Sequence, residues 1–142
     1  MVLRERKEPT MATTLTATSV ETIANTLVEK CRQSKFEEAV QELYAPEVVT
    51  IESMEMPDFP KEVKGLEAVV EKGQQWAANT EVHHIEVSEP LVAGSQFAVK
   101  FTMDMTCKQT NQRNTIEEIG LYQVENGKIV KAQFLYDACQ QS

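Results

Sequence analysis

The sequence contains no motif for a metal ion, a nucleotide or a membrane span. Its two histidines and three cysteines form neither an HExxH pair nor a Cys/His cluster, and no glycine-rich phosphate loop is present. No apolar run approaches the roughly 20 residues that a membrane-spanning helix requires. We therefore expect no metal, no cofactor and no association with a membrane.

Positive charge is also scarce. The chain has 14 Lys and Arg against 22 Asp and Glu, a net charge of −8. Proteins bind nucleic acids through clustered Lys and Arg, so this balance argues against a nucleic-acid partner. The cysteines, Cys31, Cys107 and Cys139, are odd in number and scattered, which fits a reducing compartment better than a disulfide framework. The basic start, residues 1–7, is not followed by an apolar segment, so we expect a cytoplasmic protein without a secretory signal.

The length and composition are those of one globular domain. The chain has 142 residues, of which 42% are hydrophobic and 25% charged. Residues 1–18 contain few large apolar side chains, and we interpret them as a disordered tail. We expect a single domain over residues 19–138 and a short tail over residues 139–142.

Two short helices and a strand are predicted first. Ser19 is the expected cap of a helix that runs to about residue 33, because apolar residues recur there at spacings of three and four. Ser34 is the expected cap of a second helix, which Pro46 ends. The β-branched residues of 48–54 predict a strand after it.

The second half of the chain is predicted to be mostly strands. After a third helix at about residues 65–79, strands are expected at residues 83–87, 97–106, 115–124 and 129–136. In the strand at 97–106, apolar and polar residues alternate, which predicts one apolar face. Glu125-Asn126-Gly127 is an expected hairpin turn, since Asn and Gly tolerate positive φ. Helices followed by antiparallel strands indicate an α+β domain.

Several local motifs point to a known family. They are Leu43-Tyr44-Ala45 leading into residues 48–52, Gly65 at a helix start, and residues 125–129 leading into Phe134 and Tyr136. In this order they resemble the nuclear transport factor two-like superfamily, in its SnoaL-like and ketosteroid isomerase-like branch. The resemblance implies a cystatin-like cone, in which a curved, mostly antiparallel sheet wraps around the N-terminal helices. It also implies an apolar cavity that takes a small hydrophobic molecule, and a homodimer formed through the sheet face.

The same resemblance implies two candidate catalytic acids. The isomerases of this branch place a general base ten residues into a run that starts Leu-Tyr-Ala, which corresponds to Glu52. Their protonated oxyanion-hole acid corresponds to Glu118 if one inserted residue is allowed, and to Ile119 otherwise. Their catalytic tyrosine corresponds to Val28, so that donor is missing here. Burial raises the pKa of a carboxyl group, which suits it to proton transfer near neutral pH.

Other side chains are expected to line the cavity or to assist the acids. The expected lining is Val28, Tyr44, Met54, Trp76, Met103, Tyr122, Phe134 and Tyr136. Methionines adapt to irregular shapes, and the tyrosines can supply a hydroxyl, although ordinary core packing explains the same residues. His83 or His84 is a candidate proton shuttle, with a surface position as the alternative. As neighbours in a strand, the two histidines are expected to face opposite sides.

Three classes of function stay open. The first is a cofactor-free isomerase, cyclase or hydrolase-like enzyme that acts on a small hydrophobic molecule with Glu52 as base. The second is a non-catalytic ligand carrier, and the third is a dimeric interaction module with a vestigial cavity. The acid at position 52 favours the first, and the valine at position 28 favours the second. A direct structural expectation follows, namely that Glu52 lies in a largely apolar cavity with Phe134 or Tyr136.

Overall fold

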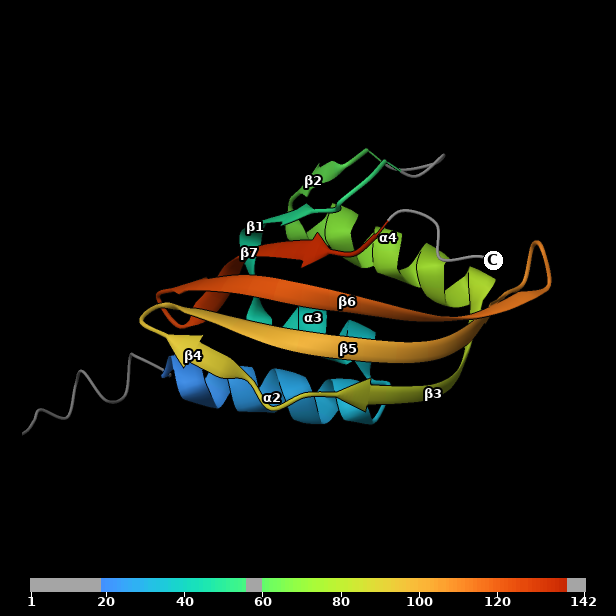
Figure 1. Ribbon diagram of the computed structural model, residues 1–142. Helices are drawn as coiled ribbons and strands as arrows, with labels where there is room; N and C mark the ends of the chain where they lie inside the picture. The colour runs from blue at the N-terminus through green and yellow to red at the C-terminus, as the bar shows by residue number, and fades with distance from the viewer. Residues whose placement is uncertain (1–18, 56–59, 138–142) are drawn as a thin grey trace, which may run out of the picture.

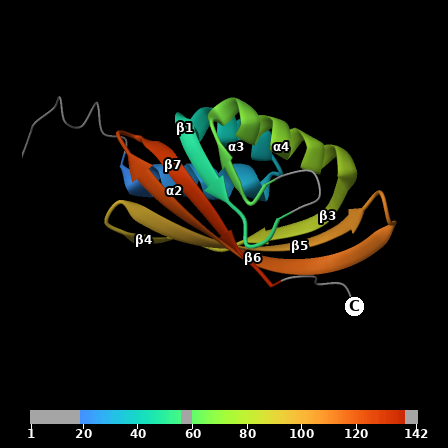
Figure 2. The ribbon, with the colours of Figure 1, turned by 90° about the horizontal axis from the view of Figure 1, so that it is seen from above.

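A curved sheet with helices on its concave side forms the fold (Figures 1 and 2). The computed structural model describes residues 19–55 and 60–137. Within them the sheet order is β2-β1-β7-β6-β5-β3, with β4 paired to β5. All neighbouring strands are antiparallel except β1 and β7, which are parallel. The predicted α+β architecture is confirmed, whereas the predicted tails and most of the Pro-rich loop at 56–60 lie outside the described residues.

Three helices are described: α2 (Val20–Arg32), α3 (Phe36–Leu43) and α4 (Leu66–Asn79). The predicted cap of α2 is confirmed, because Ser19 Oγ accepts a hydrogen bond of 3.0 Å from the backbone N–H of Thr22. The predicted cap of α3 is wrong. Ser34 has a φ of 60° and its N–H donates to the carbonyl of Cys31, so this residue ends α2. Lys35 precedes α3 without a side-chain cap.

The first strands differ most from the prediction. Strand β1 covers Tyr44–Ile51, so it starts four residues earlier than expected and includes Pro46. The pairing of β1 with β7 is irregular between Tyr44 and Val49, and such a place tolerates the missing N–H of a proline. Strands β2 (Glu62–Lys64) and β4 (Leu91–Ala93) were not predicted. Each has three residues, too few for a periodic pattern.

Four longer strands form the rest of the sheet: β3 (Thr80–Val87), β5 (Gln96–Cys107), β6 (Gln112–Glu125) and β7 (Lys128–Leu135). The apolar face of β5 is confirmed, since Phe97, Val99, Phe101 and Met103 are buried. The hairpin between β6 and β7 is also confirmed, with φ values of 53° at Asn126 and 77° at Gly127. A register shift interrupts the pairing of β6 and β7, and the buried residues of β7, Ile129 and Ala132, do not alternate.

The helices cover the concave face unevenly. Helix α2 buries five residues against the sheet, whereas α4 buries only Val69. The dense part of the core therefore lies under α2 and α3, and the side chains between α4 and the sheet are only partly buried. No helix in the described part of the chain is long and apolar enough to span a membrane.

Candidate functional site

Glu118 lies on the concave face of the sheet. It is opposite Phe101, a buried residue of β5, in the register of β5 and β6. On the other side, Ile119 pairs with Leu135, so the next position brings Tyr136 beside Glu118. The adjacent Glu117 lies on the outer face, where its exposed carboxylate is 3.4 Å from Lys100 Nζ. Strand alternation thus gives the two neighbouring glutamates opposite environments.

The environment of Glu118 favours its neutral form. Burial, together with the smaller effect of the Glu52 charge, raises the pKa of this carboxyl from 4.5 to about 7, and Lys72 acts in the opposite direction. A carboxyl with this pKa exists in both protonation states near neutral pH. It can therefore accept and return a proton there, as a general acid or base must.

Glu52 follows the end of β1 and is held by two side chains from distant parts of the chain. Tyr136 donates its hydroxyl to Glu52 Oε1 at 2.9 Å, and Lys72 Nζ lies 2.7 Å from Glu52 Oε2. The side chains of Glu52 and Lys72 are only 16% and 18% exposed, so this is a largely buried ion pair. Tyr136 is thus a direct neighbour of Glu52, whereas the largely apolar cavity expected around them stays a prediction.

The contact with Lys72 was not predicted from the sequence. The residue lies on α4, three positions after the buried Val69 and four before the half-buried Trp76. Positions three and four apart share one face of a helix. The spacing of Lys72 from Val69 and Trp76 could therefore have predicted that its ammonium group faces the sheet.

Ser53 fixes the positions of Glu52 and Tyr136 relative to each other. Its Oγ donates to the carbonyl of Phe134 at 2.8 Å and accepts from the N–H of Tyr136 at 3.1 Å. In addition, the N–H of Glu52 donates to the carbonyl of Lys61 at 2.8 Å. The two bonds of Ser53 join the segment after β1 to the end of β7, about 80 positions away in the sequence, and the bond of Glu52 joins the same segment to the residue before β2.

Tyr122 places a hydroxyl on the same face as Glu118. Its ring stacks on Phe97 with centroids 4.8 Å apart and meets Phe134 edge-on at 6.1 Å. A Cβ added at Gly120 would lie 2.7 Å from the Tyr122 hydroxyl oxygen. The ring therefore lies over Gly120, and its hydroxyl points back along β6 toward Glu118. Burial, with smaller contributions from Tyr44, Cys31 and Glu118, raises the pKa of Tyr122 well above 10.

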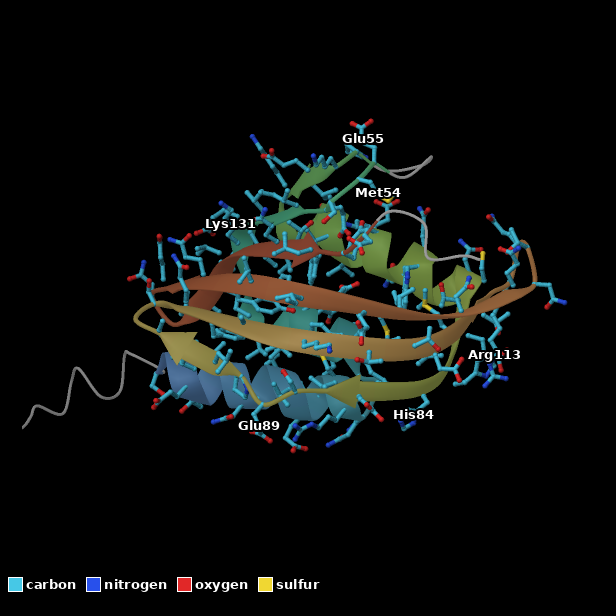
Figure 3. The ribbon with its side chains drawn as sticks, viewed as in Figure 1. Met54, Glu55, His84, Glu89, Arg113 and Lys131 are labelled. Atoms are coloured by element: carbon cyan, nitrogen blue, oxygen red, sulfur yellow. The ribbon has the colours of Figure 1, made fainter. Side chains whose placement is uncertain are left out.

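The remaining residues of the predicted lining divide into core and periphery. Val28, Tyr44 and Met103 are buried in the core. Trp76 is half-buried and packs edge-on against Phe36 at 5.9 Å, and Met54 lies beyond the end of β1 (Figure 3). Core packing explains the burial of Val28, Tyr44 and Met103. Trp76 is on the same helix as Lys72, and Met54 follows Glu52 by two positions.

The two histidines belong to the outer face of β3 and β5. His83 Nε2 is 2.7 Å from Thr106 Oγ1, and His84 Nε2 is 3.3 Å from Glu86 Oε2. A register shift between Val82 and His84 interrupts the alternation of β3, which brings both rings near Asp104 rather than to opposite faces. Figure 3 shows His84 and Arg113, the ion-pair partner of Asp104, at the same end of the sheet. The contacts of neither histidine involve Glu52 or Glu118.

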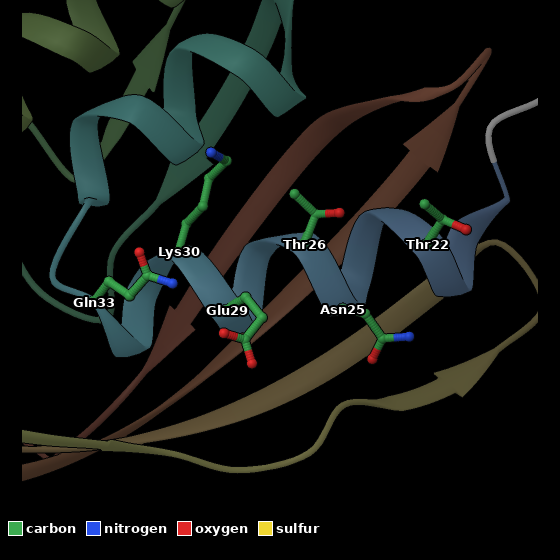
Figure 4. Close-up of a pocket in the computed structure, with 6 residues that line it drawn as sticks. All are labelled: Thr22, Asn25, Thr26, Glu29, Lys30 and Gln33. Atoms are coloured by element: carbon green, nitrogen blue, oxygen red, sulfur yellow. The ribbon is translucent and has the colours of Figure 1, made fainter.

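Hollows on the surface of the described residues include two of similar size. One of about 490 Å³ is lined by Glu118, Tyr136 and Asp137 together with outer-face residues, among them Lys100, Glu117 and Ile119. The other, of about 440 Å³, follows the polar side of α2 from Thr22 to Gln33 (Figure 4). An enclosed apolar cavity around Glu52 stays a prediction. Among residues 19–55 and 60–137, no group of three or more His, Cys, Asp or Glu side chains could hold a metal ion.

The comparisons with known proteins identify the family. Residues 18–136 match the SnoaL-like domain, so the chain belongs to this family. A crystal structure from Mesorhizobium loti, of a protein described as a SnoaL-like polyketide cyclase, is 38% identical with a TM-score of 0.78. The match covers 83% of this chain and 99% of that one. No curated protein matches the chain.

More distant structures share the fold. A protein described as an isomerase from Bacillus subtilis is 14% identical with a TM-score of 0.66, over 84% of this chain and 89% of that one. A protein of unknown function with a cystatin-like fold from Xanthomonas campestris is 13% identical with a TM-score of 0.70, over 86% and 92% of the two chains. At these identities the likeness concerns the fold alone.

Proposed function

We propose that this protein binds a small hydrophobic molecule and catalyses proton transfer on it without a cofactor, with Glu118 as the group that exchanges the proton. The observation that carries this proposal is the half-buried carboxyl of Glu118 with a pKa of about 7. The description of the Mesorhizobium loti relative as a polyketide cyclase is consistent with it.

The two acids take different roles in this proposal from those that the resemblance implied. Glu52 already accepts a hydrogen bond from Tyr136 and forms an ion pair with Lys72, so its carboxylate is occupied. Glu118 lies among apolar and hydroxyl-bearing side chains and titrates near neutrality. Two carboxyls in unequal surroundings divide acid and base duties in this way. We therefore assign proton exchange to Glu118, and we assign to Glu52 the role of neutralising the charge of Lys72.

The proposed chemistry is removal and return of a proton at a carbon beside a carbonyl group. The Glu118 carboxylate accepts the proton from carbon, and the resulting carboxyl returns it to the same or another atom of the molecule. The hydroxyl of Tyr122 is a candidate donor to the carbonyl oxygen, because the ring packing over Gly120 directs it along the same face. The step needs neither a metal ion nor a redox partner.

Deuterium uptake from D₂O by a small apolar ketone, such as 2-tetralone, tests this proposal. NMR follows the exchange at the carbon beside the carbonyl for the wild type, Glu118→Gln and Glu117→Gln. We expect Glu118→Gln to lower the rate by about 100-fold or more, because a positioned general base contributes at least that much. Glu117→Gln is the matched control, since the same change on the outer face leaves Glu118 intact. Binding of the ketone with no exchange above buffer would favour the ligand carrier instead.

We also propose that the outer face of the sheet forms a homodimer. Ile119, Leu121 and Leu135 are 42%, 41% and 39% exposed, and Ile119 pairs directly with Leu135 across β6 and β7. An exposed apolar group of this kind is typical of an interaction site. Sedimentation at micromolar concentration should give a dimer for the wild type and a monomer for Leu121→Lys. A monomeric wild type would exclude this assembly.

A further inference from the structure

We propose that Lys72 is a positioning residue for proton exchange at Glu118: its ammonium group holds Glu52 in place and offsets the negative charge of that carboxylate, so that Glu118 can release its proton as well as bind it. This inference deepens the proposed function and rests on it. No contact of Lys72 with the reacting molecule is required.

The geometry of three elements supports this role. Lys72 comes from α4, Glu52 from the end of β1 and Tyr136 from the end of β7, and the carboxylate joins the other two at 2.7 and 2.9 Å. Ile119 pairs with Leu135, so Tyr136, which binds Glu52, follows the position next to Glu118, and the charges of both members of the ion pair act on the Glu118 carboxyl. Both members of the pair are more than four-fifths removed from solvent. Charges in such surroundings are weakly screened and act strongly on a neighbour.

Lys72 also links α4 to the segment after β1. Val69 is the only buried residue of α4, and the ion pair with Glu52 adds a polar connection between this helix and the sheet. Removing one partner of a buried pair leaves an unbalanced charge, which is costly. Lys72 therefore links the position of α4 to the position of the Glu52 carboxylate, whose charge acts on Glu118.

The thiol and the tyrosine hydroxyls that interact with Glu118 stay neutral near pH 7. Burial raises the pKa of Cys31 on α2 to about 12. Burial also raises the pKa values of Tyr44 on β1, Tyr122 on β6 and Tyr136 after β7 above 10. The charges that act on Glu118 from the packed elements are thus those of Glu52 and Lys72, in opposite directions. Burial is the main cause of the raised pKa of Glu118, and the balance between these two charges adjusts it.

The test is the titration of Glu118, followed by NMR of the protein with ¹³C-labelled glutamate carboxyls and assigned with Glu118→Gln. Lys72→Met removes the charge and keeps most of the side-chain stem. It should raise the Glu118 midpoint by about one pH unit, and Glu52→Gln should lower it by about as much. Lys72→Arg should keep it near the wild-type value. Lys64→Met is the matched control, because Lys64 is exposed and pairs with Glu62 on β2.

A purely structural role of Lys72 would change the stability and leave the midpoint unmoved. If Lys72→Met does not fold, the double variant Glu52→Gln/Lys72→Met, which leaves no unpaired charge, replaces it. Its Glu118 midpoint should be higher than that of Glu52→Gln alone. Equal midpoints in this pair, or in Lys72→Met and the wild type, would overturn the inference. A wild-type midpoint near 4.5 would instead overturn the proposed function itself, so the two failures are distinguishable.

Discussion

The substitution Glu118→Gln should remove a specific pH dependence of the folding free energy. Burial raises the pKa of Glu118 from 4.5 to about 7, a difference of about 2.5 units. Below pH 4.5 the carboxyl is protonated in the folded and the unfolded chain. Between pH 4.5 and about 7 only the unfolded chain releases the proton, so the folded state loses stability as the pH rises. At about 1.4 kcal/mol per unit, the loss is roughly 3 kcal/mol and is complete above pH 7.

Urea unfolding at several pH values from 4.5 to 8 measures this effect. The wild type should lose stability over that window, and Glu118→Gln should lose much less, because its amide does not titrate. Glu117→Gln should behave as the wild type, since Glu117 is exposed and lies on the other face. Interactions that lower the pKa values of Glu38 and Asp104 act at more acidic pH, so they do not obscure the window. Identical pH dependence of the wild type and Glu118→Gln would refute the reasoning.

Three further predictions concern stability and are measured by chemical unfolding at constant pH. Thr50→Val should stabilise the protein by about 1 kcal/mol, because Thr50 is 3% exposed and its Oγ1 has no hydrogen-bond partner; a loss of stability would show that the hydroxyl is bonded. Gly120→Ala should cost about 1–3 kcal/mol through its clash with Tyr122, whereas Gly73→Ala, in open space on α4, should be neutral or stabilising; equal effects would contradict the packing. Tyr136→Phe should cost about 2 kcal/mol by removing a hydrogen bond to a charged carboxylate, and an unchanged stability would mean that this bond contributes nothing.

The periodic elements could be predicted from the sequence, and the irregular ones could not. Helix α4 and strand β5 have clear apolar spacing, and both were found at the expected places. Ser34 looked like a helix cap, but the backbone turns left-handed there to end α2. Position alone does not distinguish a serine that begins a helix from one that ends the preceding helix.

The candidate site was predicted in part. Spacing within a family motif led to Glu52, and its contact with Tyr136 was found. The orientation of Glu118 could not be derived from polarity, because β6 reverses the usual pattern at residues 118–121. Its outer face has the apolar Ile119 and Leu121, and its inner face has Glu118 and Gly120. The register with β5, in which Glu118 is opposite the buried Phe101, shows which face of β6 is turned toward the helices. The cytoplasmic location and the lining of an enclosed cavity stay predictions.

The most direct test of the central claim is infrared difference spectroscopy of the carboxyl groups at about pH 6, where a group with a pKa near 7 is mostly protonated and ordinary glutamates are ionised. The wild type should show a protonated-carboxyl C=O band that weakens through pH 7 and is absent from Glu118→Gln. A spectrum without that band, or a band that persists in Glu118→Gln, would contradict the assignment of proton exchange to Glu118.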